Sequence, residues 1–298
     1  MHLDRELWFL LWSIPFYTIF IGAEIIVSNW GDKKIYSLHG VLQNILLTIM
    51  NASLDLLLRT LFVIAILNWS YSQHFFTINN PFVYWALLFI LEDIAFYFEH
   101  RADHYCRLFW AVHLTHHSSK EYNLSTGFRS SVFQPVYRFI YFIPITLFGF
   151  EPLDILFMYS VTQTYGIIVH TQYIKKMPRF IEAIFVTPAH HRVHHASNII
   201  YLDKNMGMCL IIWDKIFGTF QKELPNEPVV YGLTSAVEDP NNALNHVGYE
   251  WKKMFKDMKR DLPFFVKLQY LFMPPGWSHD GSTKTAMQLR KELLNTTH

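Results

Sequence analysis

The chain has 298 residues, and its 25 Lys and Arg against 24 Asp and Glu give a formal net charge of +1. Apolar residues make up 51% and aromatic residues 17%, while charged residues make up 16%, against about 25% in ordinary soluble domains. This composition indicates a membrane protein, and the balanced charge excludes the basic footprint of a nucleic-acid-binding protein. The two cysteines, Cys106 and Cys209, are too few for a disulfide framework, so we expect free thiols.

Five segments are apolar enough to enter a bilayer, whose hydrocarbon core takes about 20 helical residues to cross. They run from about Leu7 to Val27, Val41 to Trp69, Pro81 to Phe98, Val132 to Phe150 and Pro152 to Val169. Only the turn Gly149-Phe150-Glu151-Pro152 joins the last two, which predicts a tight antiparallel hairpin. The sequence therefore predicts an all-α fold of multi-pass membrane helices.

Basic residues occupy alternate loops and set the expected orientation. Lys33 and Lys34 follow the first segment, and further Lys and Arg residues follow the third and the fifth, whereas residues 70–80 have none. The positive-inside rule places residues 31–40, 99–131 and everything beyond His170 in the cytoplasm. The membrane would be the endoplasmic reticulum in a eukaryote and the inner membrane in a bacterium.

Charged residues inside the second segment need an explanation, because charges within a membrane are costly. Asp55 and Arg59 are four residues apart and can pair on one helix face. We expect a structural ion pair, or a bend of this segment into the headgroups.

Nine of the sixteen histidines form three clusters. His100 and His104 make the first, His113, His116 and His117 the second, and His190, His191, His194 and His195 the third, while His170 stands alone after the fifth segment. At about 100° per residue, each cluster aims its imidazoles at one side of a helix. The third helix has a clear predicted start, since Thr187 suits the N-cap and Pro188 the first helical position.

Imidazole is a good ligand for iron, copper, zinc and nickel, and a single zinc ion takes about four ligands. Without His190 the clusters hold eight histidines, or nine with His170, which are too many for one ion and suit two, in a cap on the cytoplasmic side. His190 lies at the edge of its cluster, so we expect it to support the ligands rather than join them. Metal-bound histidines usually donate their other ring N–H to a carboxylate or carbonyl. The candidate outer partners are Glu92, Asp93, Glu99, Asp103, His190 and Asp214.

No motif for another chemistry is present: there is no G-x-S-x-G, Walker loop, H-E-x-x-H or dinucleotide fingerprint. No catalytic group beyond the metal ligands is apparent. An oxidative reaction would therefore draw its electrons from an external donor.

The motifs resemble the fatty acid hydroxylase (sterol desaturase) superfamily. The residues that carry the resemblance are Glu92-Asp93, the three histidine clusters, Ser118-Ser119 and the run from Trp213 to Phe220. The resemblance implies two iron ions, a lipid substrate and an external electron donor. It divides the chain into N-terminal membrane spans (1–80), a fatty acid hydroxylase domain (81–220) and a C-terminal cap with a polar tail (221–298).

Within the superfamily, residues 121–126, 203–205, 231–234 and 275–277 are similar to the alkylglycerol monooxygenases. That resemblance implies tetrahydrobiopterin-dependent hydroxylation of the ether-linked carbon of a glyceryl ether, which then separates into glycerol and an aldehyde. Tyr122, Asn123 and Ser125 are the candidates to hold a polar head group or cofactor. Tyr105 stands where the animal enzymes have an acidic residue, which leaves pterin or a redox protein as the donor.

Two alternatives stay open. One is a sterol or fatty-acyl hydroxylase or desaturase with the same metal site. The other is a non-redox metal-binding membrane protein or transporter, although transporters usually place their polar site near the middle of the membrane.

Overall fold

The computed structural model describes residues 2–31, 34–235, 237 and 239–296, so Lys33, one of the charges behind the expected orientation, lies outside them. Within the described residues all regular elements are helical, apart from isolated bridges between Phe185 and Leu210 and between Ala196 and Tyr231. The all-α prediction is therefore confirmed. The helices are α1 (His2–Trp30), α2 (Leu38–Leu58), η1 (Arg59–Val63), α3 (Ile64–Tyr71), α4 (Pro81–Tyr105), α5 (Arg107–His117), η2 (Leu124–Phe128), α6 (Pro135–Leu147), α7 (Pro152–Ile168), α8 (Arg179–Ile184), α9 (Pro188–His194), α10 (Ile212–Phe217), α11 (Ala243–Met258), α12 (Phe264–Phe272) and α13 (Ala286–Thr296).

Three helical stretches are long and apolar enough to cross a membrane. They are Arg5–Trp30 in α1, Leu38–Tyr71 through α2, η1 and α3, and Pro81–Tyr105 in α4. They contain the first three predicted spans, and many of their large apolar side chains face outward, as Trp12 does with 72% exposed. Contiguous apolar surface of this kind marks contact with lipid, so the chain is an integral membrane protein.

The fourth and fifth predicted spans form a shorter hairpin. α6 has 13 residues and α7 has 17, which at 1.5 Å per residue is about 20 Å and about 26 Å, short of the roughly 30 Å hydrocarbon core. Pro135 and Pro152 set the starts of the two helices. Gly149 turns between them with a φ of +98°, and a Cβ there would lie 2.0 Å from the carbonyl oxygen of Phe76. Of the five predicted apolar segments, three therefore form helices long enough to cross a membrane within the described residues, and the other two form a shorter hairpin packed among them.

The charges predicted to pair within the second span do so. Arg59 Nε contacts Asp55 Oδ2 at 2.6 Å, and Arg59 Nη1 also contacts Glu6 Oε1 of α1 at 2.8 Å. Arg59 begins the π-helical segment η1, which interrupts an otherwise continuous helix. Through these two contacts, Arg59 links α1 to α2 within the apolar helices.

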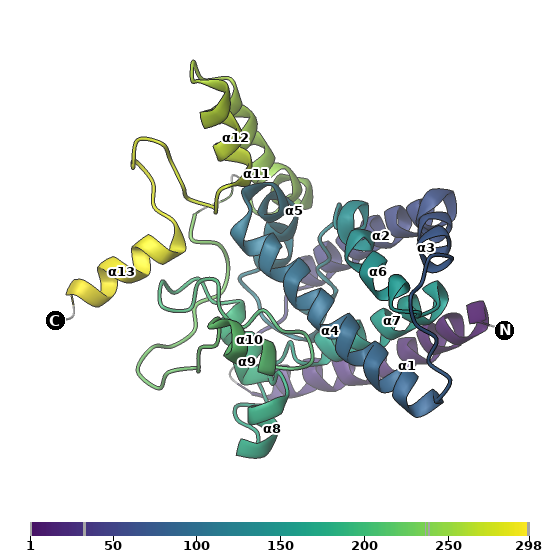
Figure 1. The fold of residues 1–298 in the computed structure, drawn as a ribbon. Helices are drawn as coiled ribbons and strands as arrows, with labels where there is room; N and C mark the ends of the chain where they lie inside the picture. The colour runs from purple at the N-terminus through teal and green to yellow at the C-terminus, as the bar shows by residue number, and fades with distance from the viewer. Residues whose placement is uncertain (1, 32–33, 236, 238, 297–298) are drawn as a thin grey trace.

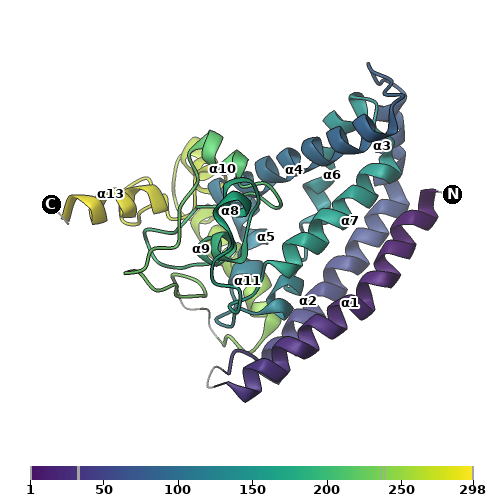
Figure 2. The ribbon, with the colours of Figure 1, turned by 90° about the horizontal axis from the view of Figure 1, so that it is seen from below.

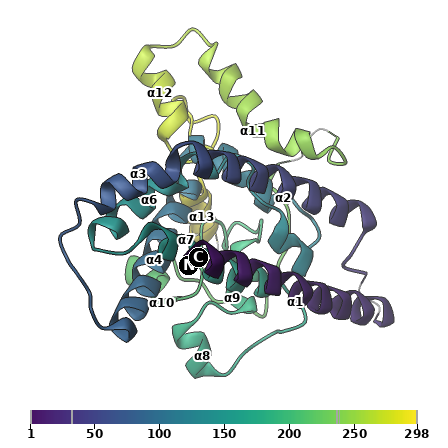
Figure 3. The same ribbon diagram turned by 90° about the vertical axis from the view of Figure 1, so that its right-hand side faces the viewer.

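The helices form two regions. In Figure 1, α1, α2, α3, α6 and α7 occupy one side, α8, α9, α10 and α13 lie on the other, and α4 extends from the first side toward α5. Helices α1 and α7 run side by side (Figure 2), and α11 and α12 project as a pair (Figure 3). The main apolar core joins α3, α4, α6 and α7 around Leu67, Leu88, Phe142 and Ile155. The polar C-terminal tail ends in a helix of its own, α13.

Candidate metal centre

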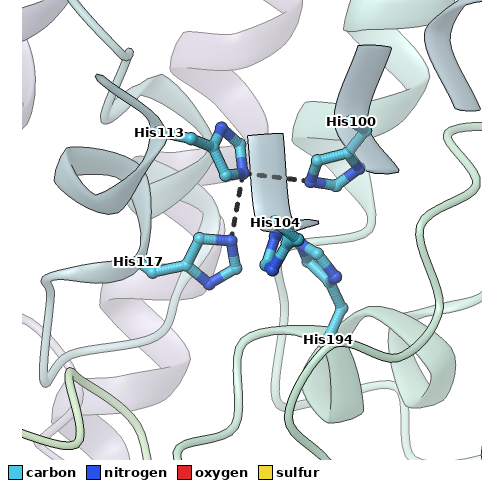
Figure 4. A group of neighbouring side chains, drawn as sticks. All are labelled: His100, His104, His113, His117 and His194. Atoms are coloured by element: carbon cyan, nitrogen blue, oxygen red, sulfur yellow. Dashed lines mark hydrogen bonds between the residues drawn. The ribbon is translucent and has the colours of Figure 1, made fainter. Parts of the chain in front are cut away.

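Five buried histidines from three helices converge on one point. His100 and His104 come from α4, His113 and His117 from α5, and His194 from α9 (Figure 4), and their candidate ligand nitrogens all lie within 4.8 Å of one another. The Nε2 atoms of His100 and His117 lie 3.0 and 3.1 Å from Nε2 of His113. Two nitrogens bound at right angles to one ion at about 2.1 Å would lie about 3.0 Å apart. The spacing therefore fits a shared metal ion.

A second group of four histidines lies beside the first. It consists of His116 from α5, His170 after α7, and His191 and His195 at α9. His170 Nε2 lies 3.0 Å from the Nε2 atoms of both His191 and His195. The structure thus places His170, the isolated histidine of the sequence, inside the second group.

Each H-x-x-H-H motif contributes to both groups. His113 and His117 share one helix face because they are four residues apart, whereas His116 points about 100° away from His117. On α9 the same rule separates His194 from the pair His191 and His195. The predicted start of α9 is present, with Thr187 as the N-cap, Pro188 in the first turn and the His190 ring completing a capping box.

Backbone carbonyls fix the orientation of four imidazoles. The Nδ1 atoms donate as follows: His100 to Met206 O at 2.8 Å, His116 to Arg129 O at 2.9 Å, His170 to Gly166 O at 2.7 Å and His194 to Lys204 O at 3.0 Å. A carbonyl can only accept, so Nδ1 carries the proton and Nε2 keeps the lone pair that a metal needs.

Histidine ring nitrogens without a hydrogen-bond partner show whether these groups suit a metal ion. The buried Nε2 atoms of His104 and His194 have no hydrogen-bond partner within the described residues. Buried polar atoms are rarely left without a partner, so these two nitrogens are suited to an ion. Burial also lowers the pKa of His116 to about 4 and holds the pKa of His117 and His195 well below the ordinary value. These three imidazoles are therefore neutral at pH 7 and competent as ligands.

Two of the candidate outer carboxylates lie close to the first group. Asp103 Oδ2 is 3.5 Å from His113 Nδ1, and Asp103 also accepts from Tyr137 Oη at 2.6 Å. Gln134 Nε2 bridges Asp103 and Glu99, donating at 3.1 and 2.9 Å. Both carboxylates are buried, so they do not lie on a solvated helix face.

Two other candidates act through the loop that precedes α10. Asp214 accepts from the backbone N–H groups of Met206 and Gly207 at 2.7 and 2.8 Å, and so fixes the carbonyl that His100 uses. Asp93 accepts from the N–H groups of Cys209 and Leu210 at 2.8 and 3.1 Å. These carboxylates hold the segment that orients a histidine, without contacting the imidazole themselves.

Within the described residues, the side chains of the remaining candidates Glu92, His190 and Tyr122 form no hydrogen bond with the histidines of the two groups. Glu92 is fully buried, and neither of its carboxylate oxygens has a hydrogen-bond partner among the described residues. The His190 ring accepts from Thr187 N at 3.2 Å and supports the start of α9. Tyr122 is buried beside His195 and stacks on Tyr231.

Asn123 and Ser125 are engaged in local hydrogen bonds. Asn123 caps η2, accepting from Ser125 N at 3.0 Å, and its amide donates to Ile35 O at 2.6 Å. Ser125 Oγ accepts from Asn44 at 3.1 Å. The role of Tyr122, Asn123 and Ser125 in holding a head group or cofactor stays a prediction.

Two supporting residues were not singled out from the sequence. Asp203 Oδ1 lies 3.2 Å from His104 Nδ1, and its φ of +54° belongs to a left-handed turn. Arg129 is fully buried and donates to Thr115 O, Ser118 Oγ and Asn44 Oδ1, while its own carbonyl holds His116. Asp203 falls in the 203–205 run that resembled known enzymes, which was the available signal, whereas no sequence pattern pointed to Arg129.

The fold and the two histidine groups define a membrane protein with a buried centre suited to metal ions. Residues 85–219 match the sequence model of the family described as Fatty acid hydroxylase. The chain therefore contains a fatty acid hydroxylase domain, as its motifs predicted. No solved structure matches the chain significantly.

Similar curated proteins include the alkylglycerol monooxygenase of Homo sapiens, 38% identical over 216 residues, or 72% of this chain and 46% of that protein. The alkylglycerol monooxygenase of Xenopus tropicalis is 34% identical over 222 residues, or 74% of this chain and 47% of that protein. An ornithine lipid hydroxylase of Rhizobium tropici is 28% identical over 172 residues, or 56% of this chain and 51% of that protein. The chain spans about half the length of the curated relatives it matches.

Proposed function

We propose that the protein is a membrane di-iron oxygenase that hydroxylates a lipid, and that its reaction is the oxidation of the ether-linked carbon of an alkylglycerol. The observation that carries the proposal is a cavity among the membrane helices that ends at the histidines. The alkylglycerol monooxygenases among the relatives suggest the substrate.

This membrane cavity has the size that a lipid chain needs, and its lining is mostly apolar, with the paired charges of Glu6, Asp55 and Arg59 also in its wall. Its volume is about 680 Å³, within the range of small-molecule sites. It is lined along α7 from Leu153 to Ile167, which at 1.5 Å per residue is about 21 Å, and by His170 beyond the end of the helix. Leu7 and Leu10 of α1 and Leu56 of α2 supply apolar walls. We infer that the alkyl tail lies along α7 and points away from the histidines.

Polar groups near the histidines suit the glycerol end of such a lipid. Ser130 and Ser131 line the cavity beside His113. Gln163 also lines it, and its buried Nε2 has no hydrogen-bond partner in the described part of the chain. An unpaired buried donor is costly, so a head-group hydroxyl that accepts from Gln163 would be bound favourably. This arrangement would bring the ether carbon next to the metal centre.

We assign the two histidine groups as the ligands of two iron ions. One ion would be held by His100, His104, His113, His117 and His194, and the other by His116, His170, His191 and His195. Iron held there would supply the activation of dioxygen. The chain itself positions the lipid carbon, and the apolar walls limit the access of water. Hydroxylation gives a hemiacetal, which separates into an aldehyde and glycerol.

The proposal also includes the membrane face on which the metal centre lies and the source of the electrons for the reaction. The loop charges favour a centre on the cytoplasmic face of the membrane. Hydroxylation by dioxygen needs two electrons besides those of the substrate, and tetrahydrobiopterin or a redox protein would supply them.

Other lipid substrates are the main alternative. The relatives also include an ornithine lipid hydroxylase and a sterol desaturase, which oxidise different lipids according to their names. A non-redox metal-binding protein or transporter is the alternative from another class, and it predicts no oxygen-dependent product.

The test is the release of aldehyde from a 1-O-alkylglycerol by membranes containing the full chain, in air and under nitrogen. We expect release only in air, and its loss in His194→Ala at unchanged protein level. Ala52→Trp fills the membrane cavity, whereas Ser53→Trp adds the same side chain at an exposed position outside its lining. Only the first should abolish release. Release that persists in His194→Ala would overturn the proposal.

A further inference from the structure

The helix pair α11–α12 exposes large apolar side chains outside the membrane spans. Phe255 of α11 is 61% exposed, and Phe264, Phe265 and Phe272 of α12 are 67%, 78% and 55% exposed. Leu244, in the first turn of α11, is 57% exposed. The two helices pack against each other, so these side chains belong to one part of the surface. Apolar surface gathered in this way marks a contact with a partner or a membrane.

One face of α11 borders a second cavity. This cap cavity has a volume of about 560 Å³, and Lys253 and Lys256 of α11 line it. The histidines in its lining are His104, His117, His194 and His195. The remaining five histidines of the two groups line the membrane cavity. Lys253 and Lys256 therefore face the cap cavity, and the exposed apolar residues of α11 lie on another face.

The outer face of α11 combines apolar and basic side chains. At about 100° per residue, Leu244, Trp251 and Phe255 fall within about 40° of one another. Lys252 and Lys259 lie about 40–60° to one side of Phe255. Both lysines are exposed and, within the described part of the chain, line neither cavity. An apolar stripe flanked by lysines is typical of a helix at a lipid surface, because the lysine stems cover apolar groups while their ammonium groups reach the headgroups.

The start of α11 is tied to a membrane span. Gln43 Nε2 of α2 donates to the carbonyl oxygens of Pro240 and Asn241 at 3.2 and 2.7 Å. Gln43 lies about 8 Å along the helix axis from the first residue of α2. Ala243 of α11 belongs to the same apolar cluster as Leu47 of α2. α11 therefore begins beside the first turns of the second span.

α5 holds the pair in a fixed position. Arg107 of α5 contacts Glu250 Oε1 and Asp257 Oδ2 of α11 at 2.6 and 2.7 Å, and its backbone N–H donates to Met273 O after α12 at 3.1 Å. The pair lies on the side of α2 and α3 that is opposite α1 in Figure 3, and it runs across the direction of α1 in Figure 1. A pair that starts beside the end of a span and runs across the spans lies along the membrane surface.

The charge of the pair selects the kind of partner. Residues 243–272 contain six Lys or Arg and three Asp or Glu. Two of the three acids, Glu250 and Asp257, are already paired with Arg107. A second copy of the chain would bring like charges together on this face, whereas an anionic lipid surface attracts them.

We propose that the outer face of α11 and α12 binds the anionic lipid surface beside the membrane spans. Phe255, Phe265 and Phe272 enter the boundary between headgroups and acyl chains, and Lys252 and Lys259 contact lipid phosphates. The histidine-bearing helix α5, on which the pair packs, is thereby held to the membrane at a second place besides the spans.

Photo-crosslinking identifies the molecule that covers this face. The photoreactive residue p-benzoylphenylalanine replaces Phe255 or Phe265 in the full chain, which is reconstituted in vesicles of phosphatidylcholine with about one fifth phosphatidylglycerol. The same residue at Leu61, which is 66% exposed in the second span, is the positive control. At Val230, which is 57% exposed outside the pair, it is the negative control. Gel filtration establishes that each variant is folded, and mass spectrometry identifies the adducts.

We expect lipid adducts at Phe255, Phe265 and Leu61, and none at Val230. Adducts between two protein chains at Phe255 and Phe265, in place of lipid adducts, would overturn the proposal. So would the absence of any adduct at both positions while Leu61 forms lipid adducts.

Lysine variants test the choice of anionic lipid. Phosphatidylglycerol should be enriched among the adducts at Phe255, because one lysine near an anionic surface corresponds to at most about 5-fold in local lipid concentration. Lys252→Gln combined with Lys259→Gln should remove this enrichment. Lys222→Gln combined with Lys291→Gln changes the charge equally at exposed positions outside the pair, and should leave it unchanged. Equal enrichment in both double variants would overturn the proposal, and no step depends on turnover of a substrate.

Discussion

The replacement of Asp203 by glycine should loosen one metal ion and leave the other in place. Asp203 Oδ1 lies 3.2 Å from His104 Nδ1, and His104 belongs only to the five-histidine group. Glycine keeps the left-handed backbone at φ +54° without strain, so the change removes the carboxylate alone.

The expected magnitude follows from this hydrogen bond. A hydrogen bond to a charged group contributes about 1.5–3 kcal/mol, and Asp203 is 21% exposed, which favours the lower half of that range. A loss of about 2 kcal/mol corresponds to roughly 30-fold in affinity, within the 10- to 100-fold typical of outer partners of metal ligands.

The assay is a chelator titration of the iron-loaded protein under nitrogen, with iron counted per chain. We expect Asp203→Gly to release one iron at roughly 30-fold lower chelator concentration, and the second iron at the original concentration. Asp203→Asn should fall in between, because its amide oxygen can still accept from His104. Asp239→Gly is the matched control, since Asp239 also has a positive φ of 44° but is exposed and lines neither cavity. Release of both irons at the original concentration in Asp203→Gly would refute the reasoning.

Three further predictions address the ligands, the head group and the buried arginine. His191→Ala should lower the iron content from two toward one per chain, because His191 belongs only to the four-histidine group. Elemental analysis measures this content, and two tightly bound irons per chain would contradict the prediction. Gln163→Leu should raise KM for an alkylglycerol about 5- to 10-fold with little change in kcat, as the loss of one neutral hydrogen bond implies; an unchanged KM would remove Gln163 from the head-group site. Arg129→Met should destabilise the protein by at least about 3 kcal/mol in thermal unfolding, because several buried acceptors lose their donor. Arg129→Lys should restore little of this stability, since an ammonium cannot reproduce the planar fork of bonds.

The sequence alone determined the helical fold, the membrane character and the histidines that meet. These properties depend on local patterns: apolar runs of spanning length, and histidines spaced at i,i+3 and i,i+4 on short helices. Such patterns can be read without knowing what packs against them. The hairpin turn at Gly149 and the capped start of α9 at Thr187 were predicted for the same reason. The length of the helices in the hairpin was not predicted, because an apolar run has the same composition whether lipid or protein surrounds it.

Only the tertiary structure decided how the histidines are divided. Adjacent residues such as His116 and His117 look equivalent in a motif, but the histidines that come from α4, α9 and the end of α7 meet the two imidazoles in different groups. The same packing places His170 in the second group, supplies carbonyls from Met206 and Arg129 to distant histidines, and separates the membrane cavity from the cap cavity. These contacts join residues far apart in the chain, and their pairing is set by the packing of whole helices, which no local spacing encodes.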